Sequence, residues 1–192
     1  SLVGGIRGSF ANEMFYDFSV GWGVSELDYT LNNTTNSSLG LGADGNPAQM
    51  KFDPGGYEQE EINLNADFSK ALSDSLNLAF GFEWREETYT VMPGEVNASI
   101  GAGSSGFPGI RAEDSGEFDR DNWAAYVDIE HDITDSWLMQ YALRYEDFSD
   151  FGDTTNGKLA TRFNATDWLT LRGAISTGFH APTPGQANVQ TT

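Results

Sequence analysis

Cysteine is absent from this 192-residue chain, and cations are few: 10 lysines and arginines stand against 29 aspartates and glutamates, for a net charge of −19. The lack of cysteine excludes a disulfide framework and any thiolate metal site. An acidic chain is repelled by phosphates, so the charge argues against a nucleic-acid partner. It also disfavours a basic surface for anionic lipid.

Long hydrophobic runs are absent too. The run from Leu78 to Phe82 is among the longest, at five residues, far short of the ~20 apolar residues of a membrane helix. No N-terminal signal peptide is visible, because Ser1 opens directly on strand-like sequence. Glycine (22 residues) and aromatics (13%) are abundant. Both suit a transmembrane β-barrel, in which only alternate residues face lipid.

Alternation of apolar and polar residues is the main pattern of the chain. It is clearest from residue 76 onward, where every second residue is large and apolar: Leu76, Leu78, Phe80, Phe82 and Trp84. A period of two with one apolar face is typical of half-buried strands. The pattern predicts eight strands, near residues 2–10, 14–31, 57–72, 76–91, 121–133, 137–148, 158–164 and 168–179.

The predicted connections alternate in length. Short turns rich in Asn, Asp and Ser alternate with outer loops expected at 32–56, 92–120 and 149–157. Short turns on one side and long loops on the other are typical of outer-membrane barrels, with the short side periplasmic. We therefore predict an all-β fold, an antiparallel up-and-down meander of about eight strands. Residues 1–192 would form one partial β-barrel domain.

The stretch from Leu169 to Pro184 carries the most specific motif. A strand with one apolar face ends in the run Ser-Thr-Gly-Phe-His-Ala-Pro-Thr-Pro, whose two prolines break it. This run resembles a segment in the barrel of TonB-dependent outer-membrane receptors. The motif residues are Thr177, Gly178, Phe179, His180, Ala181 and Pro182. The family more often has Arg where His180 stands.

The resemblance implies a nutrient-uptake receptor in the outer membrane of a Gram-negative cell. Such receptors have a 22-strand barrel with a plug inside it. Implied partners are outer-membrane lipid, TonB through a plug segment, and an extracellular siderophore, vitamin or oligosaccharide. Neither a plug nor a TonB segment is recognised in this sequence. Both chain ends would lie on the outer side, so we expect these residues to be part of a larger transmembrane barrel.

Support for catalysis is weak. The two histidines, His131 and His180, have no nucleophile or base at a supporting spacing. Acidic groups such as Asp147, Asp150 and Asp153 lack the spacing of an EF-hand, and a solvated loop is the preferred interpretation. We therefore expect no enzyme activity, no cofactor and no dedicated metal site, with calcium binding by the loops left open.

Aromatic side chains in the predicted outer loops are candidate ligand contacts, because their rings can stack on a siderophore or a sugar. They are Phe52, Tyr57, Phe107, Phe118 and Phe151. The same rings could instead fold the loops onto one another. Charged strand residues should face the barrel lumen. We favour ion pairs between neighbouring strands of the wall over contacts of these residues with a plug. These are Glu83, Arg85, Glu87, Asp128, Arg144 and Arg172, together with Tyr126.

Two other architectures fit the same alternation. One is a small intact outer-membrane anchor barrel, closed by these strands alone. The other is a soluble extracellular β-sandwich that binds carbohydrate, whose core would also take alternating aromatic residues.

Overall fold

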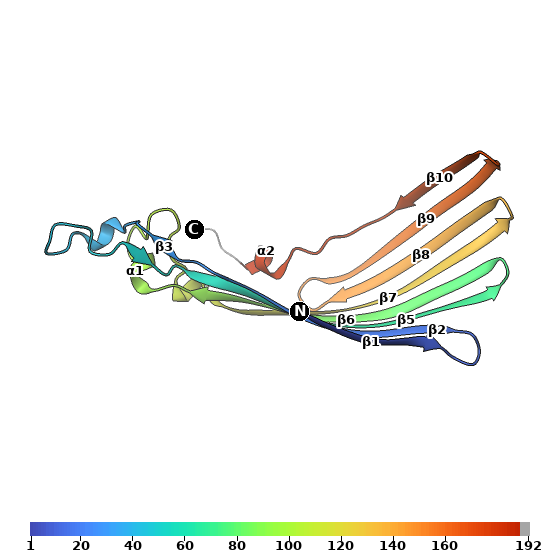
Figure 1. Ribbon diagram of the computed structural model, residues 1–192, viewed down its shortest axis with the longest axis horizontal. Coiled ribbons are helices and arrows are strands. Elements are labelled where there is room, and N and C mark those ends of the chain that lie inside the picture. The colour runs from blue at the N-terminus through green and yellow to red at the C-terminus, as the bar shows by residue number, and fades with distance from the viewer. Residues whose placement is uncertain (189–192) are drawn as a thin grey trace. The chain divides into compact units, whose positions relative to one another are not determined.

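The computed structural model describes residues 1–188, and eight long strands form one sheet (Figure 1). The sheet order is β1-β2-β5-β6-β7-β8-β9-β10, so each long strand pairs with the next along the chain. The strands are β1 (Leu2–Ser9), β2 (Phe15–Asp28), β5 (Gly55–Ser73), β6 (Leu76–Pro93), β7 (Gly116–Thr134), β8 (Trp137–Phe148), β9 (Gly152–Thr166) and β10 (Leu169–Ser176). The predicted antiparallel meander is confirmed. β1 and β10 are the two edges, so the sheet is open and does not form a small closed barrel.

The predicted loop at 149–157 is wrong. β9 already begins at Gly152 and pairs antiparallel with β8, from the pair Phe148–Gly152 down to Trp137–Phe163. Four of its first six residues, Gly-Asp-Thr-Thr-Asn-Gly, are of types depleted in strands: two Gly, one Asp and one Asn. Pairing with β8 therefore sets their conformation, and only three residues connect the two strands.

The last predicted strand is too long at its end, since β10 stops at Ser176. The backbone N–H of Thr177 still donates to the carbonyl of Gly157 at 2.9 Å. The N–H of Gly157, however, donates to the Thr177 side-chain oxygen Oγ1 at 2.9 Å. A side chain thus takes the place of a strand carbonyl, and the ladder ends there.

The four short turns are closed by hydroxyl and amide side chains. Backbone N–H groups donate to a side-chain oxygen two or three residues earlier, as such residues favour in tight turns. The pairs are Met14 to Asn12 (3.2 Å), Ser75 to Ser73 (3.3 Å), Ser136 to Thr134 (3.3 Å) and Leu169 to Thr166 (3.1 Å). The turn positions agree with those that the sequence pattern predicts.

The chain divides into two compact units. Unit 1 comprises Ser1–Trp22, Ile62–Glu86 and Arg120–Ala181, and it holds the parts of the strands next to the four short turns. Unit 2 comprises Gly23–Glu61, Glu87–Asp119 and the segment from Pro182 onward. It holds the other ends of several strands and the long connections.

Unit 1 is a single sheet that exposes large apolar side chains. Ile6 is 63% exposed, Leu171 is 55% exposed and Ile175 is 73% exposed, and every strand segment in the unit belongs to the same sheet. A sandwich buries its alternating apolar face against a second sheet, and soluble proteins rarely expose so much contiguous apolar surface. The soluble-sandwich alternative is therefore not what the structure shows.

Unit 2 is a folded arrangement of the two long connections. It contains β3 (Leu31–Asn32) paired with β4 (Lys51–Phe52), and the short helices η1 (Ser37–Leu39), α1 (Val96–Ser99), η2 (Ala112–Asp114) and α2 (Pro184–Asn188). Asn36 is 3% exposed, and its Nδ2 donates to the carbonyls of Asn97 and Ile100, both at 2.8 Å. Neither α-helix in the described part of the chain is long and apolar enough to cross a membrane.

Candidate functional site

Four rings in unit 2 form an aromatic cluster: Tyr29, Tyr57, Tyr89 and Phe107. Tyr57 stacks on Tyr89 with ring centroids 5.9 Å apart, and Tyr29 meets Tyr57 edge-on at 6.2 Å. The Phe107 ring lies 4.9 Å from that of Tyr29. All four rings are half-buried. Partly exposed aromatic rings that carry hydroxyl groups offer both apolar and polar contacts, which suits an aromatic or cyclic ligand.

The hydroxyls of Tyr57 and Tyr89 stay protonated at neutral pH, because the pKa of each is raised. Burial raises the pKa of Tyr57, and the neighbouring Tyr29 raises it further. Burial likewise raises the pKa of Tyr89, followed by the effects of Tyr57 and Tyr29. The hydroxyls are therefore available as hydrogen-bond donors to an oxygen-rich ligand.

The structure does not gather the five predicted loop aromatics into one site. Tyr57 and Phe107 belong to the aromatic cluster. Phe52 is 1% exposed, so its ring packs within the loops and is left out of the candidate ligand contacts. Phe118 lies on β7, half-buried, and Phe151 lies in the turn between β8 and β9.

Two cluster members, Tyr29 and Tyr89, are not among the predicted contacts, and both fall inside predicted strands, 14–31 and 76–91. A signal was present, however. Tyr29, Tyr57 and Tyr89 stand near the long-loop ends of β2, β5 and β6, which are neighbours in a meander.

The family motif anchors the chain that leaves β10. The Phe179 ring lies 5.4 Å from that of Phe151, which stacks on Phe148 at 4.3 Å. Above Phe151 lies the guanidinium of Arg120, 5.5 Å from the ring centroid. Arg120 is 3% exposed, and its Nε donates to Asp150 Oδ2 at 2.8 Å. Phe179 thus reaches the turn between β8 and β9.

The other motif residues differ in their surroundings. Thr177 is hydrogen-bonded to Gly157, as described above, whereas a β-carbon at Gly178 would meet no atom within 4 Å. His180 is exposed and Ala181 is half-buried. Within the described residues the motif therefore acts through Thr177 and Phe179, which fix the exit of β10.

The polar face of unit 1 carries ion pairs and hydrogen bonds between side chains of four strands, β5 to β8. Glu83 on β6 accepts from Arg85 at 3.0 Å and from Arg144 on β8 at 2.9 Å, and Arg144 also donates to Glu146 at 2.9 Å. The Tyr126 hydroxyl on β7 donates to Asp67 Oδ1 at 2.6 Å. These contacts pair Glu83, Arg144 and Tyr126 with other wall residues, the arrangement favoured for the lumen-facing charges. Arg172, by contrast, is in no ion pair of the described residues.

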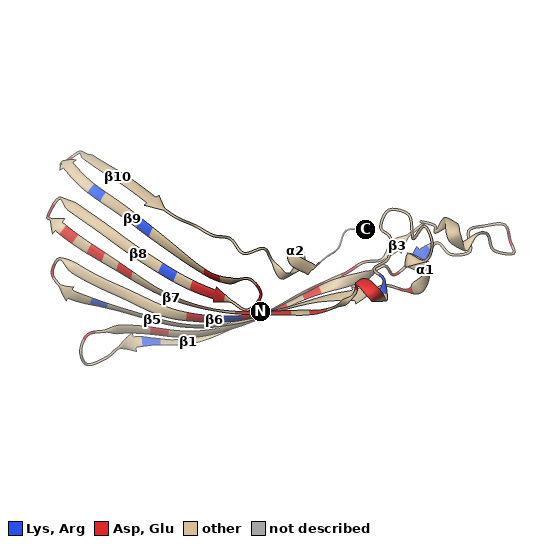
Figure 2. Cartoon of the chain, turned by 180° about the vertical axis from the view of Figure 1, so that it is seen from behind, with Lys and Arg blue, Asp and Glu red and all other residues tan. Residues whose placement is uncertain are grey.

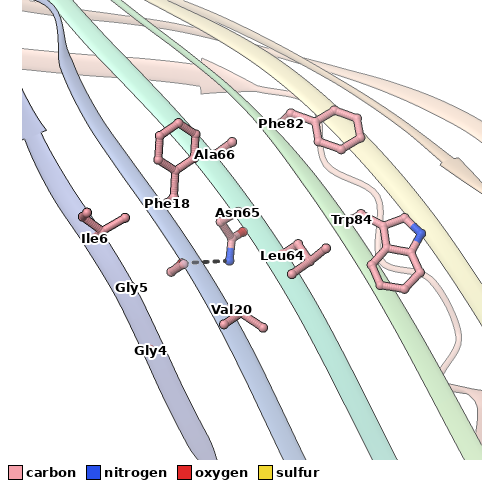
Figure 3. Close-up of a pocket in the computed structure, with 11 residues that line it drawn as sticks. Gly4, Gly5, Ile6, Phe18, Val20, Leu64, Asn65, Ala66, Phe82 and Trp84 are labelled. Atoms are coloured by element: carbon pink, nitrogen blue, oxygen red, sulfur yellow. Dashed lines mark hydrogen bonds between the residues drawn. The ribbon is translucent and has the colours of Figure 1, made fainter. Parts of the chain in front are cut away.

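The opposite face of unit 1 is apolar and carries an open hollow (Figure 3). Small residues at Gly4 and Ala66 leave space among larger side chains: Ile6, Phe18, Val20, Leu64, Phe82 and Trp84. Rings contact one another across the strands of this face, such as Phe82 with Trp123 at 6.4 Å and Trp123 with Tyr145 at 5.2 Å. Alternation thus separates a mainly apolar face from a charged one.

No group of three or more His, Asp or Glu side chains that could hold a metal ion exists among residues 1–188. The acidic groups of the sequence, including Asp147, Asp150 and Asp153, therefore do not converge on one point in the described structure.

Comparison with known proteins identifies a family that matches this chain. Residues 5–191 match the family described as TonB dependent receptor-like, beta-barrel. Comparison with curated protein sequences gives no match.

Two solved structures share the fold. The siderophore receptor PirA from Acinetobacter baumannii superposes with a TM-score of 0.64 at 16% identity, over 92% of this chain and 24% of that one. A variant of the ferric enterobactin receptor PfeA from Pseudomonas aeruginosa superposes with a TM-score of 0.59 at 14% identity, over 95% of this chain and 24% of that one. This chain thus spans about a quarter of each receptor. With the match over residues 5–191, the chain belongs to the family of TonB-dependent receptor β-barrels.

Proposed function

We propose that the protein containing this chain is a nutrient-uptake receptor of the Gram-negative outer membrane, driven by TonB, and that these residues form part of its barrel wall and outer loops. The observation that carries the proposal is the two-faced sheet of unit 1. Its apolar face exposes large side chains such as Ile175, at 73%, while its other face pairs Glu83 with Arg144. This is the pattern of a wall between lipid and a wet lumen.

The ligand class that we propose is a siderophore, captured at the aromatic cluster of unit 2. Rings and protonated hydroxyls suit the ring systems and oxygen atoms of such ligands. The two structures that share the fold are both named as receptors for siderophores or their ferric complexes. A vitamin or an oligosaccharide is the alternative, and the binding test below includes both.

The charge of unit 2 restricts the proposed class of ligand further. Unit 2 carries 13 acidic and two basic side chains. Such a surface repels anions and attracts cations over about a Debye length. A neutral or positively charged ferric complex, for example a ferric tris-hydroxamate, fits this surface better than a strongly anionic ferric tris-catecholate.

The experiment measures binding and uptake by the full-length protein. We expect saturable binding of a neutral ferric tris-hydroxamate, weaker binding of an anionic tris-catecholate, and uptake only in cells that contain TonB. The vitamin cobalamin and a maltooligosaccharide serve as competing ligands. Tyr57→Ala should weaken binding by about 2- to 10-fold, the effect of losing one ring contact.

Matched variants separate stacking from folding. Tyr57→Phe keeps the ring and should bind nearly as well as the wild type, and Phe118→Ala, outside the cluster, should have no effect on affinity. TonB-independent uptake would contradict the proposed mechanism. Equal affinity of Tyr57→Ala and the wild type would contradict the proposed ligand site.

A further inference from the structure

Three cations gather on the polar face of β9 and β10: Lys158, Arg162 and Arg172, here called the basic cluster. Arg162 lies directly opposite Arg172 in the register of the two strands, and Lys158 lies opposite Ser176. All three line one hollow together with Gln140 of β8. Figure 2 shows basic bands on β9 and acidic bands along β7. The cluster is unusual in a chain with only 10 basic residues and a net charge of −19.

The basic cluster forms no ion pair with any carboxylate of residues 1–188. The ion pairs of the described chain use other arginines, at positions 85, 111, 120 and 144. Gln140, which shares the hollow, donates to Asp128 Oδ2 at 2.7 Å, so this carboxylate of β7 is already bonded to an amide. The three cations are also exposed, which leaves their donors accessible from the polar face.

Like charges directly opposite each other destabilise a pair of strands. A bound anion would reverse that effect, since guanidinium groups bind carboxylate or phosphate through two parallel hydrogen bonds. We propose that the basic cluster is an anion-binding site that takes a carboxylate. The carboxylate comes either from an acidic side chain of a polypeptide segment lying against this face or from a free solute in the lumen. The inference rests on the proposed function only in treating this face as the inside of a barrel.

The test compares the thermal unfolding of full-length wild type and variants in detergent, at rising concentrations of NaCl and of inorganic phosphate. If no anion binds, Arg172→Gln relieves repulsion and raises Tm, and salt raises the Tm of the wild type by screening. If a carboxylate binds, Arg172→Gln lowers Tm and salt lowers the Tm of the wild type. The double variant R162Q/R172Q should then lose that salt dependence, whereas a general folding defect would retain it.

The effect of phosphate distinguishes the two possible sources of the anion. A Tm of the wild type that rises with phosphate at fixed ionic strength, but not in R162Q/R172Q, identifies a free anion. A lower Tm of Arg172→Gln without any phosphate effect identifies a carboxylate of the polypeptide. Arg111→Gln is the matched control, because it removes the same charge from an ion pair whose side chains are 52% and 73% exposed.

The result that overturns the proposal is an unchanged or higher Tm of Arg172→Gln without a phosphate shift. This readout is independent of uptake. A failure of the proposed transport function would therefore appear in the binding and uptake assay, and a failure of the anion site in the unfolding assay.

Discussion

Arg120 combines burial with two contacts that hold the turn between β8 and β9. It is 3% exposed, donates to Asp150 and lies over the Phe151 ring. Arg120→Met keeps the side-chain volume but leaves Asp150 without this donor. We expect a loss of ~1–3 kcal/mol in the free energy of unfolding, the usual effect of removing one partner of a charged hydrogen bond.

Denaturant titration of the full-length protein measures that loss. Arg111→Met is the control, because an exposed ion pair contributes at most ~1 kcal/mol. Equal stabilities of the two variants would contradict the role given to Arg120.

Phe179 is the motif residue whose side chain contacts another aromatic ring. Phe179→Ala removes the ring 5.4 Å from Phe151, and we expect a local loss of ~0.5–1.5 kcal/mol, the strength of an aromatic pair. Hydrogen exchange should become faster at Thr177 and Gly157, which are hydrogen-bonded to each other. His180→Ala, at an exposed position, should change neither the local stability nor the rate of hydrogen exchange at Thr177 and Gly157. A larger effect of His180→Ala than of Phe179→Ala would contradict the role of Phe179 in anchoring the chain after β10.

Among the elements, the two long connections depend on side chains that reach across the chain. Asn36 bonds to carbonyls 61 and 64 residues away, while its own Oδ1 accepts from the Ser38 N–H at 3.0 Å. Asn36→Ala removes all three hydrogen bonds and leaves the Asn97 carbonyl without its side-chain donor, while the Ile100 carbonyl still accepts from the Gly103 N–H at 3.1 Å. We expect ~1–3 kcal/mol of local destabilisation, confined to unit 2.

Hydrogen exchange read by peptide fragments checks this confinement. Protection should fall in residues 31–52 and 96–110 but stay unchanged in β8 and β9. Asn46→Ala, whose Nδ2 bonds locally to Asp44 at 3.0 Å, is the matched control. A uniform loss of protection in both units would contradict the prediction.

These elements also show what the sequence can and cannot reveal. The alternation from Leu76 to Trp84 predicts β6 because each side chain reports its own face. Residues 152–157 carry no such pattern, and they become a strand only by pairing with β8. The ordering of unit 2 depends on contacts such as Asn36 with Ile100, which no local pattern reveals.

The candidate site was predictable in part for the same reason. Aromatic composition pointed to Tyr57 and Phe107, and the meander order contained the signal for Tyr29 and Tyr89. The burial of Phe52, at 1% exposure, was not visible in the sequence, because it depends on how the loops fold together.

At the scale of the whole molecule, the central claim is that the apolar face of unit 1 contacts lipid and the other face lines a lumen. Successive residues of β10 should then alternate between two environments. Leu171, Gly173 and Ile175 share the apolar face, and Arg172 and Ala174 share the polar face. The stretch has no cysteine of its own, so single introduced cysteines report single positions.

The most direct measurement is the accessibility of spin labels on cysteines introduced one at a time at positions 171 to 175 of the full-length protein in lipid vesicles. The account predicts a period of two. Labels at 171, 173 and 175 should collide with oxygen dissolved in lipid, and labels at 172 and 174 should be shielded from it. Equal accessibility along the strand, or oxygen collisions strongest at 172 and 174, would contradict a membrane wall with this face toward lipid.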